Sequence, residues 1–446
     1  MTTQTSSDEF AGLADLMRDE YDAPDPRDPT LRRRRLRGVL IAMLVVLALV
    51  AAVGGYAAWA LTAPLPAPVE SVRTPVVTAP EAVTLDLPDA GSSAVSVAGA
   101  EEYLGAEANG IWATSGDNSP RPLASITKLI TALVILDARP LADENDPGPT
   151  ITFTSADNDL YDEYYVKGAT IAAMPTGSSM SLREALAAML IPSASNYADV
   201  VSRWTFGSRW AFLEAARAWL AKNGLTGTTI VEPTGIDPGN TSTPTDLIAL
   251  GRLAAQHPVV AQIARSASAN LPGVGTVYNT NSLLGTSGIT GLKTGNLGGD
   301  THNLLYTAKV DIGTGTPLSV VGVVMGGASR QSVNDAVVGL LDSVRSGFHD
   351  VPVATQGRVV GTYSTAWGAS ADIVMASDAS IFTWSDTPIE VSLTTTEPKT
   401  FADGEVVGTI TWTAGPKTAT AELVIDGTIE PPSEWWRLTH PGELGG

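Results

Sequence analysis

Cysteine is absent from this chain of 446 residues, and that single absence removes several kinds of chemistry. A disulfide, a zinc site built on cysteine and a thiol nucleophile are all excluded. With no cysteine at all, cysteine use also gives no indication of the cellular compartment. Lysine and histidine are scarce as well, at seven and four residues. A motif that requires lysine is therefore less expected by chance.

Basic residues are few overall, with 27 Lys and Arg against 47 Asp and Glu, so the net charge is −20. Such an acidic protein argues against nucleic acid as its partner.

The length predicts two or three domains. Apolar runs typical of strands occur near both ends of residues 89–350, with helical patterns between them. This order favours an α+β fold in which helices cover an antiparallel sheet.

Residues 38–61 carry no charge over 24 positions, and five arginines at positions 32–35 and 37 precede them. The run is long enough to span a hydrocarbon core of about 30 Å. The basic cluster predicts that residues 1–37 remain in the cytoplasm as a disordered tail. We expect a single-pass cell-membrane protein with its remainder outside the cell. A cleaved signal peptide is the alternative, but its apolar core would be shorter and nearer the N-terminus.

Three further segments differ in composition from residues 89–350. Residues 62–88 contain six prolines and predict an extended extracellular linker. Residues 351–432 alternate apolar and polar positions in short runs, which is typical of a small all-β domain, and residues 433–446 form a tail. Five tryptophans could form a glycan-binding surface, although core packing accounts better for most of them: positions 367, 384, 412, 435 and 436.

A serine and a lysine lie at helical spacing at the start of an apolar run, residues 129–136. Ser125 and Lys128 would share a helix face, so the amine can reach back to the hydroxyl. A serine becomes a good nucleophile when a neighbouring base takes its proton, and a lysine is such a base when burial or a nearby cation keeps it neutral. Alone, the pair is also compatible with a helix-capping serine and a solvated lysine.

Two later stretches favour the catalytic interpretation. Residues 192–198 read Pro-Ser-Ala-Ser-Asn-Tyr-Ala and follow an amphipathic helical pattern at 182–191. Residues 288–295 form a strand-like segment that ends in Lys293, Thr294 and Gly295. A serine with lysine, a second serine loop and then Lys-Thr-Gly, in that order, is the three-part signature of the penicillin-recognising serine enzymes.

On these residues the chain resembles the D-alanyl-D-alanine carboxypeptidases, which are low-molecular-mass penicillin-binding proteins. Residues 177–180, 232–240 and 280–284 add to the likeness, which covers roughly residues 90–350. The resemblance implies a five-stranded antiparallel sheet flanked by helices, with the active site at their junction. It also implies a hydrolase that trims peptidoglycan stem peptides ending in D-Ala-D-Ala and is inhibited by β-lactams. Together with the apolar run at residues 38–61, this predicts a membrane-anchored enzyme, and we expect no cofactor or metal.

The resemblance assigns the catalytic roles. Ser125 would attack the carbonyl of the penultimate D-alanine and form an acyl-enzyme. Lys128 would be the general base, and Ser193 would relay a proton to the leaving amine. By analogy with the family, the backbone N–H groups of Ser125 and Asn296 would form the oxyanion hole.

The third motif is expected to hold the substrate. Lys293 would attract the terminal carboxylate and lower the pKa of the neighbouring amine. Thr294 would hydrogen-bond that carboxylate, and Gly295 would allow the substrate backbone to approach closely.

One triplet departs from the family pattern. The family has Ser-x-Asn as its second motif, whereas this chain has Ser193-Ala194-Ser195, with Asn196 one position later. A serine fills only part of the role of the missing asparagine, which would bond the base lysine and the substrate backbone. We therefore expect Ser195 or Asn196 to contact the substrate. The departure also motivates a non-enzyme alternative, a penicillin-binding or cell-wall-binding scaffold that has lost turnover.

Other enzyme classes fit the sequence less well. A Ser-His-Asp hydrolase would need a histidine in a nucleophile-elbow context, and His302, the one nearest the third motif, favours a structural role. A β-lactamase usually has Ser-Asp-Asn and a deacylating glutamate, and neither is evident. Asp159, Asp162 and Glu163 resemble a metal cluster only superficially, and a solvated acidic loop accounts better for them.

Overall fold

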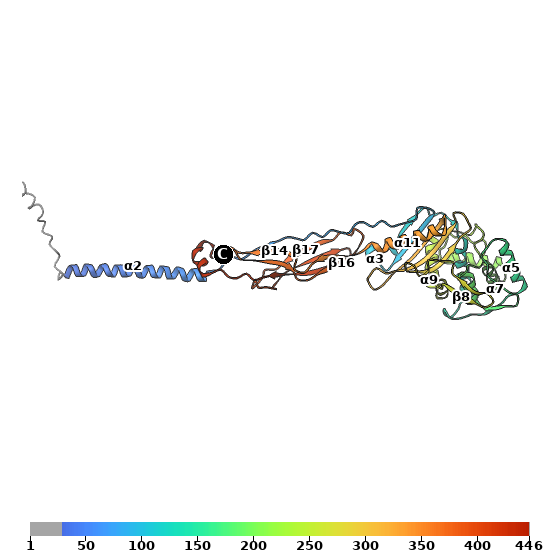
Figure 1. Cartoon of the computed structure of the whole chain (residues 1–446), viewed down its shortest axis with the longest axis horizontal. Coiled ribbons are helices and arrows are strands. Elements are labelled where there is room, and N and C mark those ends of the chain that lie inside the picture. The colour runs from blue at the N-terminus through green and yellow to red at the C-terminus, as the bar shows by residue number, and fades with distance from the viewer. Residues whose placement is uncertain (1–28, 446) are drawn as a thin grey trace, which may run out of the picture.

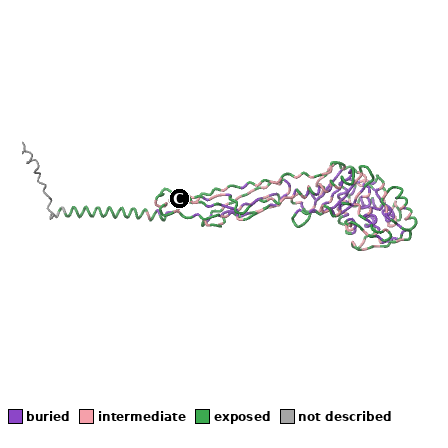
Figure 2. Tube along the Cα trace, viewed as in Figure 1, coloured by how far each residue is buried: buried purple, intermediate pink, exposed green. Residues whose placement is uncertain are grey.

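A computed structural model describes residues 29–445 of the chain. The molecule is elongated (Figure 1), with helix α2 at one end, a slender β-domain in the middle and a larger α+β domain at the far end. Buried residues concentrate in the far domain, whereas α2 is exposed over most of its length (Figure 2).

Helix α2, Pro29–Thr62, contains the apolar run predicted from the sequence. It is the one described helix that is long and apolar enough to cross a membrane. The helix begins at Pro29, before the predicted start at Gly38, and so includes the arginines that we assigned to a disordered tail. Arginine favours helices and proline is well tolerated in the first turn, which accounts for the earlier start. The rest of the predicted tail, residues 1–28, lies outside the described residues.

The α+β domain is built on a five-stranded antiparallel sheet with the order β10-β11-β12-β2-β3. Its strands are β2 (Ser92–Ala98), β3 (Ala113–Ser115), β10 (Ile289–Gly295), β11 (His302–Val310) and β12 (Leu318–Gly327). The five-stranded antiparallel sheet inferred from the sequence is therefore confirmed. Strands from the two ends of the domain meet in it, because β2 pairs with β12.

The two faces of this sheet pack against different helices. Along β12, Val323 contributes to the core formed with the central helices, and Val324 contributes to the core on the opposite face. Period-two alternation along the strand produces this division. One face is covered by α11 (Arg330–Ser346), and the other by the helices α4 (Thr127–Ala138), α6 (Leu182–Leu190), α7 (Ser195–Phe206), α9 (Pro244–Gln256) and α10 (Pro258–Ala264).

Local signals in the sequence fix several helix starts. Ser181 caps α6 and Thr243 caps α9, which has a proline at its first position. Helix α8 (Arg209–Lys222) ends at Asn223, which is followed by a glycine. Shorter elements complete the domain: α3 (Glu101–Leu104), α5 (Ser155–Val166), η1 (Ala106–Asn109), η2 (Ala124–Ile126), and the paired strands β4 (Arg121–Pro122) with β7 (Thr241–Ser242), β5 (Thr150–Thr152) with β6 (Ser179–Ser181), and β8 (Ser268–Leu271) with β9 (Gly275–Tyr278).

The β-domain contains a six-stranded sheet with the order β1-β14-β15-β19-β18-β17. Its first strand, β1 (Val69–Val72), comes from the segment predicted to be a linker and pairs with β14. Trp412 is fully buried in the core of this domain. The other strands are β14 (Val359–Ser364), β15 (Ser370–Met375), β17 (Glu390–Thr395), β18 (Val406–Ala414) and β19 (Lys417–Asp426), with β13 (Phe348–Ala354) and β16 (Ala379–Trp384) forming a separate pair.

Aromatic side chains fill the junction between the two domains. Phe348 and Phe382 stack at a centroid distance of 5.7 Å, and Tyr103 meets both rings edge-on. Next to them, Lys417 of the β-domain forms an ion pair of 2.8 Å with Glu102 of the α+β domain. The junction is thus packed rather than connected only by the chain.

The C-terminal end of the chain returns to α2. Helix α12 (Glu434–Thr439), followed by η3 (Pro441–Glu443), packs against the end of α2. The Arg437 guanidinium donates a hydrogen bond of 2.9 Å to the Ala63 carbonyl, and the Tyr56 hydroxyl donates one of 2.7 Å to the Leu438 carbonyl. An arginine at this place satisfies carbonyl groups that a helix C-terminus leaves free.

Candidate active site

Ser125 lies in the short helix η2, which leads directly into α4. The residue before it, Ala124, has a φ of +47°, a left-handed conformation that is unusual for a residue with a side chain. Ser125 lines a cavity of about 390 Å³ at the junction of the sheet and the helices. Strained backbone next to a nucleophile is a feature that functional sites often hold in place.

Lys128 is fully buried one helical turn after Ser125. Its Nζ lies 3.0 Å from Ser125 Oγ and donates a hydrogen bond of 2.7 Å to the Thr234 carbonyl. Burial lowers the pKa of Lys128 to about 7, although the Glu232 carboxylate acts in the opposite direction. The serine is therefore paired with an amine that can be neutral at physiological pH.

The loop at residues 232–240 contacts Lys128 through the Thr234 carbonyl and passes against the backbone beside Ser125. The Glu232 carboxylate accepts hydrogen bonds from the backbone N–H groups of Thr234 and Gly235, which fixes the position of the Thr234 carbonyl. A Cβ on Gly235 would lie 1.9 Å from the Ala124 carbonyl oxygen. This glycine therefore permits the loop to pass against the backbone beside Ser125. Residues 232–240 were part of the family resemblance, but the contact of this loop with Lys128 was not predicted.

Ser193 and Ser195 of the second motif line the same cavity as Ser125. Ser193 has a φ of +71°, and within residues 29–445 its hydroxyl has no protein hydrogen-bond partner. Ser195 begins helix α7 and is almost fully buried, with its backbone N–H donating to the Thr170 carbonyl at 2.8 Å. The structure thus brings Ser193 and Ser195 to the same cavity as Ser125.

Asn196 does not reach the cavity. It is fully buried, and its side-chain amide donates a hydrogen bond of 2.8 Å to the Ala172 carbonyl and accepts one of 3.2 Å from the Ala172 N–H. Because α7 begins at Ser195, the next side chain points about 100° further around the helix axis. The expectation that Asn196 contacts substrate is therefore corrected: its amide fastens the segment at Ala172 to α7.

Lys293 is also buried, on β10. Its Nζ donates hydrogen bonds to the Thr280 hydroxyl at 3.4 Å and to the Thr294 carbonyl at 3.2 Å. Burial, together with the charges of Lys128 and Arg330, lowers its pKa well below the usual range. Lysine charges close to each other disfavour the ionised form of each.

The three residues after Lys293 lie at or beside the cavity wall. The Thr294 hydroxyl is 2.7 Å from that of Thr280. A Cβ on Gly295 would lie 2.6 Å from the Leu123 carbonyl oxygen, so this glycine allows β10 to pack against the chain entering η2. Asn296 is exposed, and its side-chain oxygen accepts a hydrogen bond of 2.7 Å from the Gly298 N–H.

Two residues at this site were not identified from the sequence. The Asn303 amide donates hydrogen bonds to the carbonyls of Pro122, at 2.9 Å, and Leu123, at 3.2 Å, and so fixes the chain leading to Ser125. Arg330, the first residue of α11, lines the cavity and forms no ion pair with the described residues. These contacts join positions far apart in the chain, so no local pattern marks them.

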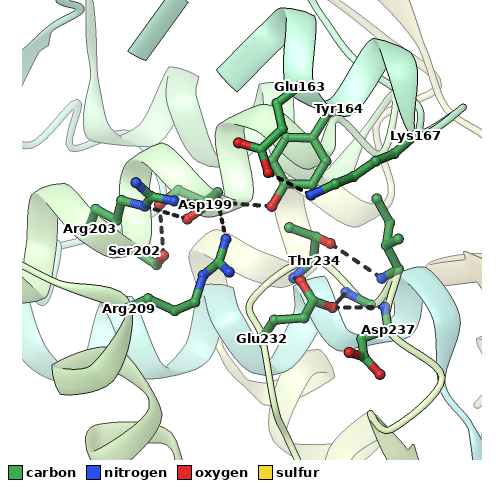
Figure 3. Close-up of polar contacts among 12 residues, drawn as sticks. Glu163, Tyr164, Lys167, Asp199, Ser202, Arg203, Arg209, Glu232, Thr234 and Asp237 are labelled. Atoms are coloured by element: carbon green, nitrogen blue, oxygen red, sulfur yellow. Dashed lines mark hydrogen bonds and ion pairs between the residues drawn. The ribbon is translucent and has the colours of Figure 1, made fainter. Parts of the chain in front are cut away.

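A buried ion-pair network supports the helices behind the second motif (Figure 3). The Asp199 carboxylate accepts hydrogen bonds from the Tyr164 hydroxyl at 2.8 Å, from Arg203 Nε at 2.7 Å and from Arg209 Nη2 at 2.6 Å. Burial alone would raise the pKa of Asp199, but the hydrogen bonds of Arg203 and the charge of Arg209 hold it below the usual range. The network ties α5, α7 and α8 together behind Ser195.

The other candidates from the sequence do not contact Ser125 or Lys128. His302 lines the cavity at the start of β11. Asp159, Asp162 and Glu163 belong to α5, and Glu163 forms an ion pair of 2.6 Å with Lys167. Within the described residues, no group of three histidine or acidic side chains is arranged to hold a metal ion.

Comparisons with solved structures show a shared fold. Penicillin-binding protein 6B from Escherichia coli superposes with a TM-score of 0.51 at 21% identity, covering 80% of this chain and all of that one. Penicillin-binding protein 5 from Haemophilus influenzae has a TM-score of 0.50 at 17% identity and covers 81% of this chain. At these identities the likeness concerns the fold alone, and it agrees with the antiparallel sheet and helices described above.

Sequence comparisons cover the same domain. The chain is 32% identical to the D-alanyl-D-alanine endopeptidase of Escherichia coli over 143 residues, which is 32% of this chain and 43% of that protein. It is 29% identical to the D-alanyl-D-alanine carboxypeptidase DacB2 of Mycobacterium tuberculosis over 207 residues, or 45% of this chain and 66% of that protein. The chain thus spans less than half the length of the endopeptidase relative. The family model for D-alanyl-D-alanine carboxypeptidase matches residues 98–329, just over half of the chain, and the protein belongs to this family.

Proposed function

We propose that the protein is a membrane-anchored serine D-alanyl-D-alanine carboxypeptidase that acts on peptidoglycan stem peptides and is inhibited by β-lactams. One observation carries the proposal. The Ser125 hydroxyl lies 3.0 Å from the Nζ of Lys128, a buried lysine whose pKa is lowered to about 7. A hydroxyl paired with a base that is partly neutral at physiological pH is an activated nucleophile.

In the first step, Ser125 Oγ attacks the carbonyl carbon of the penultimate D-alanine while Lys128 Nζ accepts the hydroxyl proton. The backbone N–H groups of Ser125 and Asn296 would stabilise the negative oxygen of the tetrahedral intermediate. Collapse of this intermediate breaks the C–N bond and leaves an ester on Ser125. The leaving amine receives its proton through Ser193, whose hydroxyl is uncommitted among the described residues and lines the same cavity.

In the second step, a water molecule attacks the ester carbonyl and gives its proton to the same base. The C–O bond to Ser125 breaks, Ser125 regains its proton, and the shortened peptide leaves with a new carboxylate. A β-lactam would enter the cycle at the first step, because its strained amide presents the same kind of carbonyl to Ser125. The acylated enzyme would then be trapped by slow hydrolysis.

The terminal carboxylate of the substrate would lie near the third motif. Thr294 lines the cavity and offers a hydroxyl. Lys293 lies behind it, with its Nζ bonded to the Thr294 carbonyl, and Arg330 lines the same cavity, so two basic side chains are near this end. A guanidinium can bind a carboxylate through two parallel hydrogen bonds. We therefore assign Arg330 to the substrate carboxylate together with Lys293 and Thr294.

Helix α2 would span the cell membrane, with the arginines at its start in the cytoplasm and the folded domains outside. The apolar segment within Arg32–Thr62, which is exposed over most of its length, supports this placement. Protease added to intact protoplasts should digest the folded domains and leave a short membrane-bound fragment. Complete protection would reverse the proposed orientation, and a mature protein that begins near Ala63 without protease would indicate a cleaved signal peptide.

The activity is tested by incubating the full-length protein in detergent with a peptide ending in D-Ala-D-Ala and measuring released D-alanine. The wild-type protein should release D-alanine, and Ser125→Ala should release none. Intact-mass analysis after penicillin treatment should show one adduct, on the peptide that contains Ser125. An adduct on Ser193 instead, or no adduct while a known penicillin-binding control is labelled, would refute the assignment.

A second candidate is a penicillin-binding scaffold without turnover, favoured by the serine at position 195 in place of the family asparagine. In that case the penicillin adduct would form on Ser125 but no D-alanine would be released. A further assay uses a cross-linked dimer of stem peptides as substrate, because the Escherichia coli relative is an endopeptidase. Cleavage of the dimer without release of terminal D-alanine would change the assignment to an endopeptidase.

A further inference from the structure

A second cavity, of about 470 Å³, lies between the five-stranded sheet and helices α9 and α10, on the face opposite α11. It shares no lining residue with the cavity around Ser125. Strand β10 contributes Thr290 and Leu292 to the second cavity, and Thr294 and Gly295 to the first. The two cavities therefore follow one another along the same strand.

The second cavity exists because the packing between helix and sheet changes at one point. At Gly251 of α9, an added Cβ would lie 2.6 Å from a methyl group of Val321, so helix and sheet are in closest approach there. Beyond it the sheet face becomes polar, with Ser96, Thr307 and Ser319 along the cavity wall. Hydroxyl-bearing side chains at these positions leave space that valine or leucine would fill, and they require polar partners.

Three cationic side chains line this cavity: Arg252, Arg265 and Lys309. Arg252 donates hydrogen bonds to the Ser96 hydroxyl at 2.5 Å and to the Gly110 carbonyl at 2.9 Å, and Lys309 donates one to the Ser319 hydroxyl at 2.6 Å. All of these acceptors are neutral.

No acidic side chain balances these charges. None of the three cations forms an ion pair with the residues that the structure describes, and no described acidic residue lines the cavity. In a protein with a net charge of −20, three basic side chains that line one cavity without an acidic partner are an exception. Such a concave positive site concentrates anions, since low-dielectric walls focus its field.

The remaining walls define the size and chemistry of a ligand. The volume falls in the range of small-molecule sites, about 300–1,000 Å³. Thr290, Thr307 and Gln256 present hydroxyl and amide groups, whereas Leu292 and Val321 present apolar surface. This mixture suits a polyhydroxylated body with both C–H and O–H faces. We propose that the second cavity binds a hexose-sized anion, with its phosphate or carboxylate held between Arg252, Arg265 and Lys309.

Binding is tested by titration calorimetry on the full-length protein in detergent with four water-soluble hexoses. Glucose 6-phosphate and glucuronate carry the two candidate anionic groups, glucose is neutral and glucosamine is cationic. At least one anion should bind at least tenfold more tightly than glucose, and glucosamine should bind least. The ratio between the two anions identifies the preferred charged group. Equal heats for all four compounds would overturn the proposal.

The variant Arg265→Ala/Lys309→Ala removes two of the cations and keeps Arg252, which also holds the backbone at Gly110. It should weaken the binding of the preferred anion at least tenfold. The matched control Arg217→Ala/Lys222→Ala removes two exposed cations that form ion pairs on α8 and should leave binding unchanged. An equal loss in the control would mean that only net charge matters, and the proposed site would be wrong.

Arg330→Ala separates the two cavities, because Arg330 lines only the one around Ser125. Anion binding should persist in this variant, and its loss would place the anion at the active site and overturn the proposal. The calorimetric readout does not depend on D-alanine release. Failure of the proposed carboxypeptidase activity and failure of this anion site would therefore be seen in different experiments.

Discussion

The pH dependence of acylation follows from the burial of Lys128. Its pKa of about 7 means that the amine changes from mostly ionised to mostly neutral between pH 6 and pH 8. With a single titration, the neutral fraction rises from about 0.09 at pH 6 to about 0.91 at pH 8. Because the neutral amine accepts the Ser125 proton, the acylation rate should rise about tenfold over this interval and level off above pH 8.

The measurement is the rate constant for labelling by a fluorescent penicillin at subsaturating concentration, taken from pH 5.5 to pH 9. Lys128→Arg is the matched variant, because arginine keeps the charge and cannot act as a base near neutral pH. Its rate should be lower by a factor of about 10² to 10⁴, the range for loss of a general base, and should not rise between pH 6 and pH 8. A wild-type rate that is constant from pH 6 to pH 9, or a fully active arginine variant, would refute the role of Lys128.

Three further outcomes are expected. Burying Lys128 costs about 4 kcal/mol of folding free energy at pH 7, because its pKa falls from about 10.4 in the unfolded chain. Lys128→Met also loses two hydrogen bonds of about 1 kcal/mol each, so the variant should be more stable by about 2 kcal/mol in thermal melts. This gain should shrink as the pH rises from 7 to about 10, where the unfolded lysine also loses its proton, and a gain that does not change with pH would contradict the reasoning. Gly235→Ala should lose penicillin labelling and at least about 2 kcal/mol of stability, because φ is +83° and the Ala124 carbonyl occupies the Cβ position, whereas Gly224→Ala, with a φ of +72° and open space around it, should keep its labelling. Ser195→Asn should raise D-alanine release about tenfold if a hydrogen bond of about 1.5–3 kcal/mol forms in the transition state, and Asn196→Ala should lower thermal stability without affecting the chemistry of the remaining folded protein.

The sequence identified the parts of the site that depend on local spacing. Ser125 and Lys128 are three residues apart, so their meeting follows from helix geometry alone. The two serines of the second motif also line the cavity, because one precedes α7 and the other begins it. Asn196 was misassigned because the direction of its side chain depends on the residue at which α7 begins, and helix boundaries are the least certain feature of a sequence pattern.

Other parts of the site depend on contacts between distant segments. The hydrogen bond from Asn303 to Leu123 spans 180 positions, and the one from Lys128 to Thr234 spans 106. The reason for Gly295 also differs from the expected one, since the glycine allows close packing against Leu123 within the protein itself. In the β-domain, β1 has only four residues, too few for alternation to predict a strand within a proline-rich segment.

Because α12 packs against α2, the chain enters and leaves the folded domains at the same place, the end of α2. The outgoing path runs from α2 through β1, and the incoming path runs from β13 through the β-domain to Arg437 at the end of α2. A single nick between β1 and β2 would therefore not by itself free the α+β domain. The domain would stay tethered through the intact incoming path, with β1 still paired to β14 and α12 still docked on α2. Release of the domain by a protease would thus require a second event, either another cut or separation of these contacts.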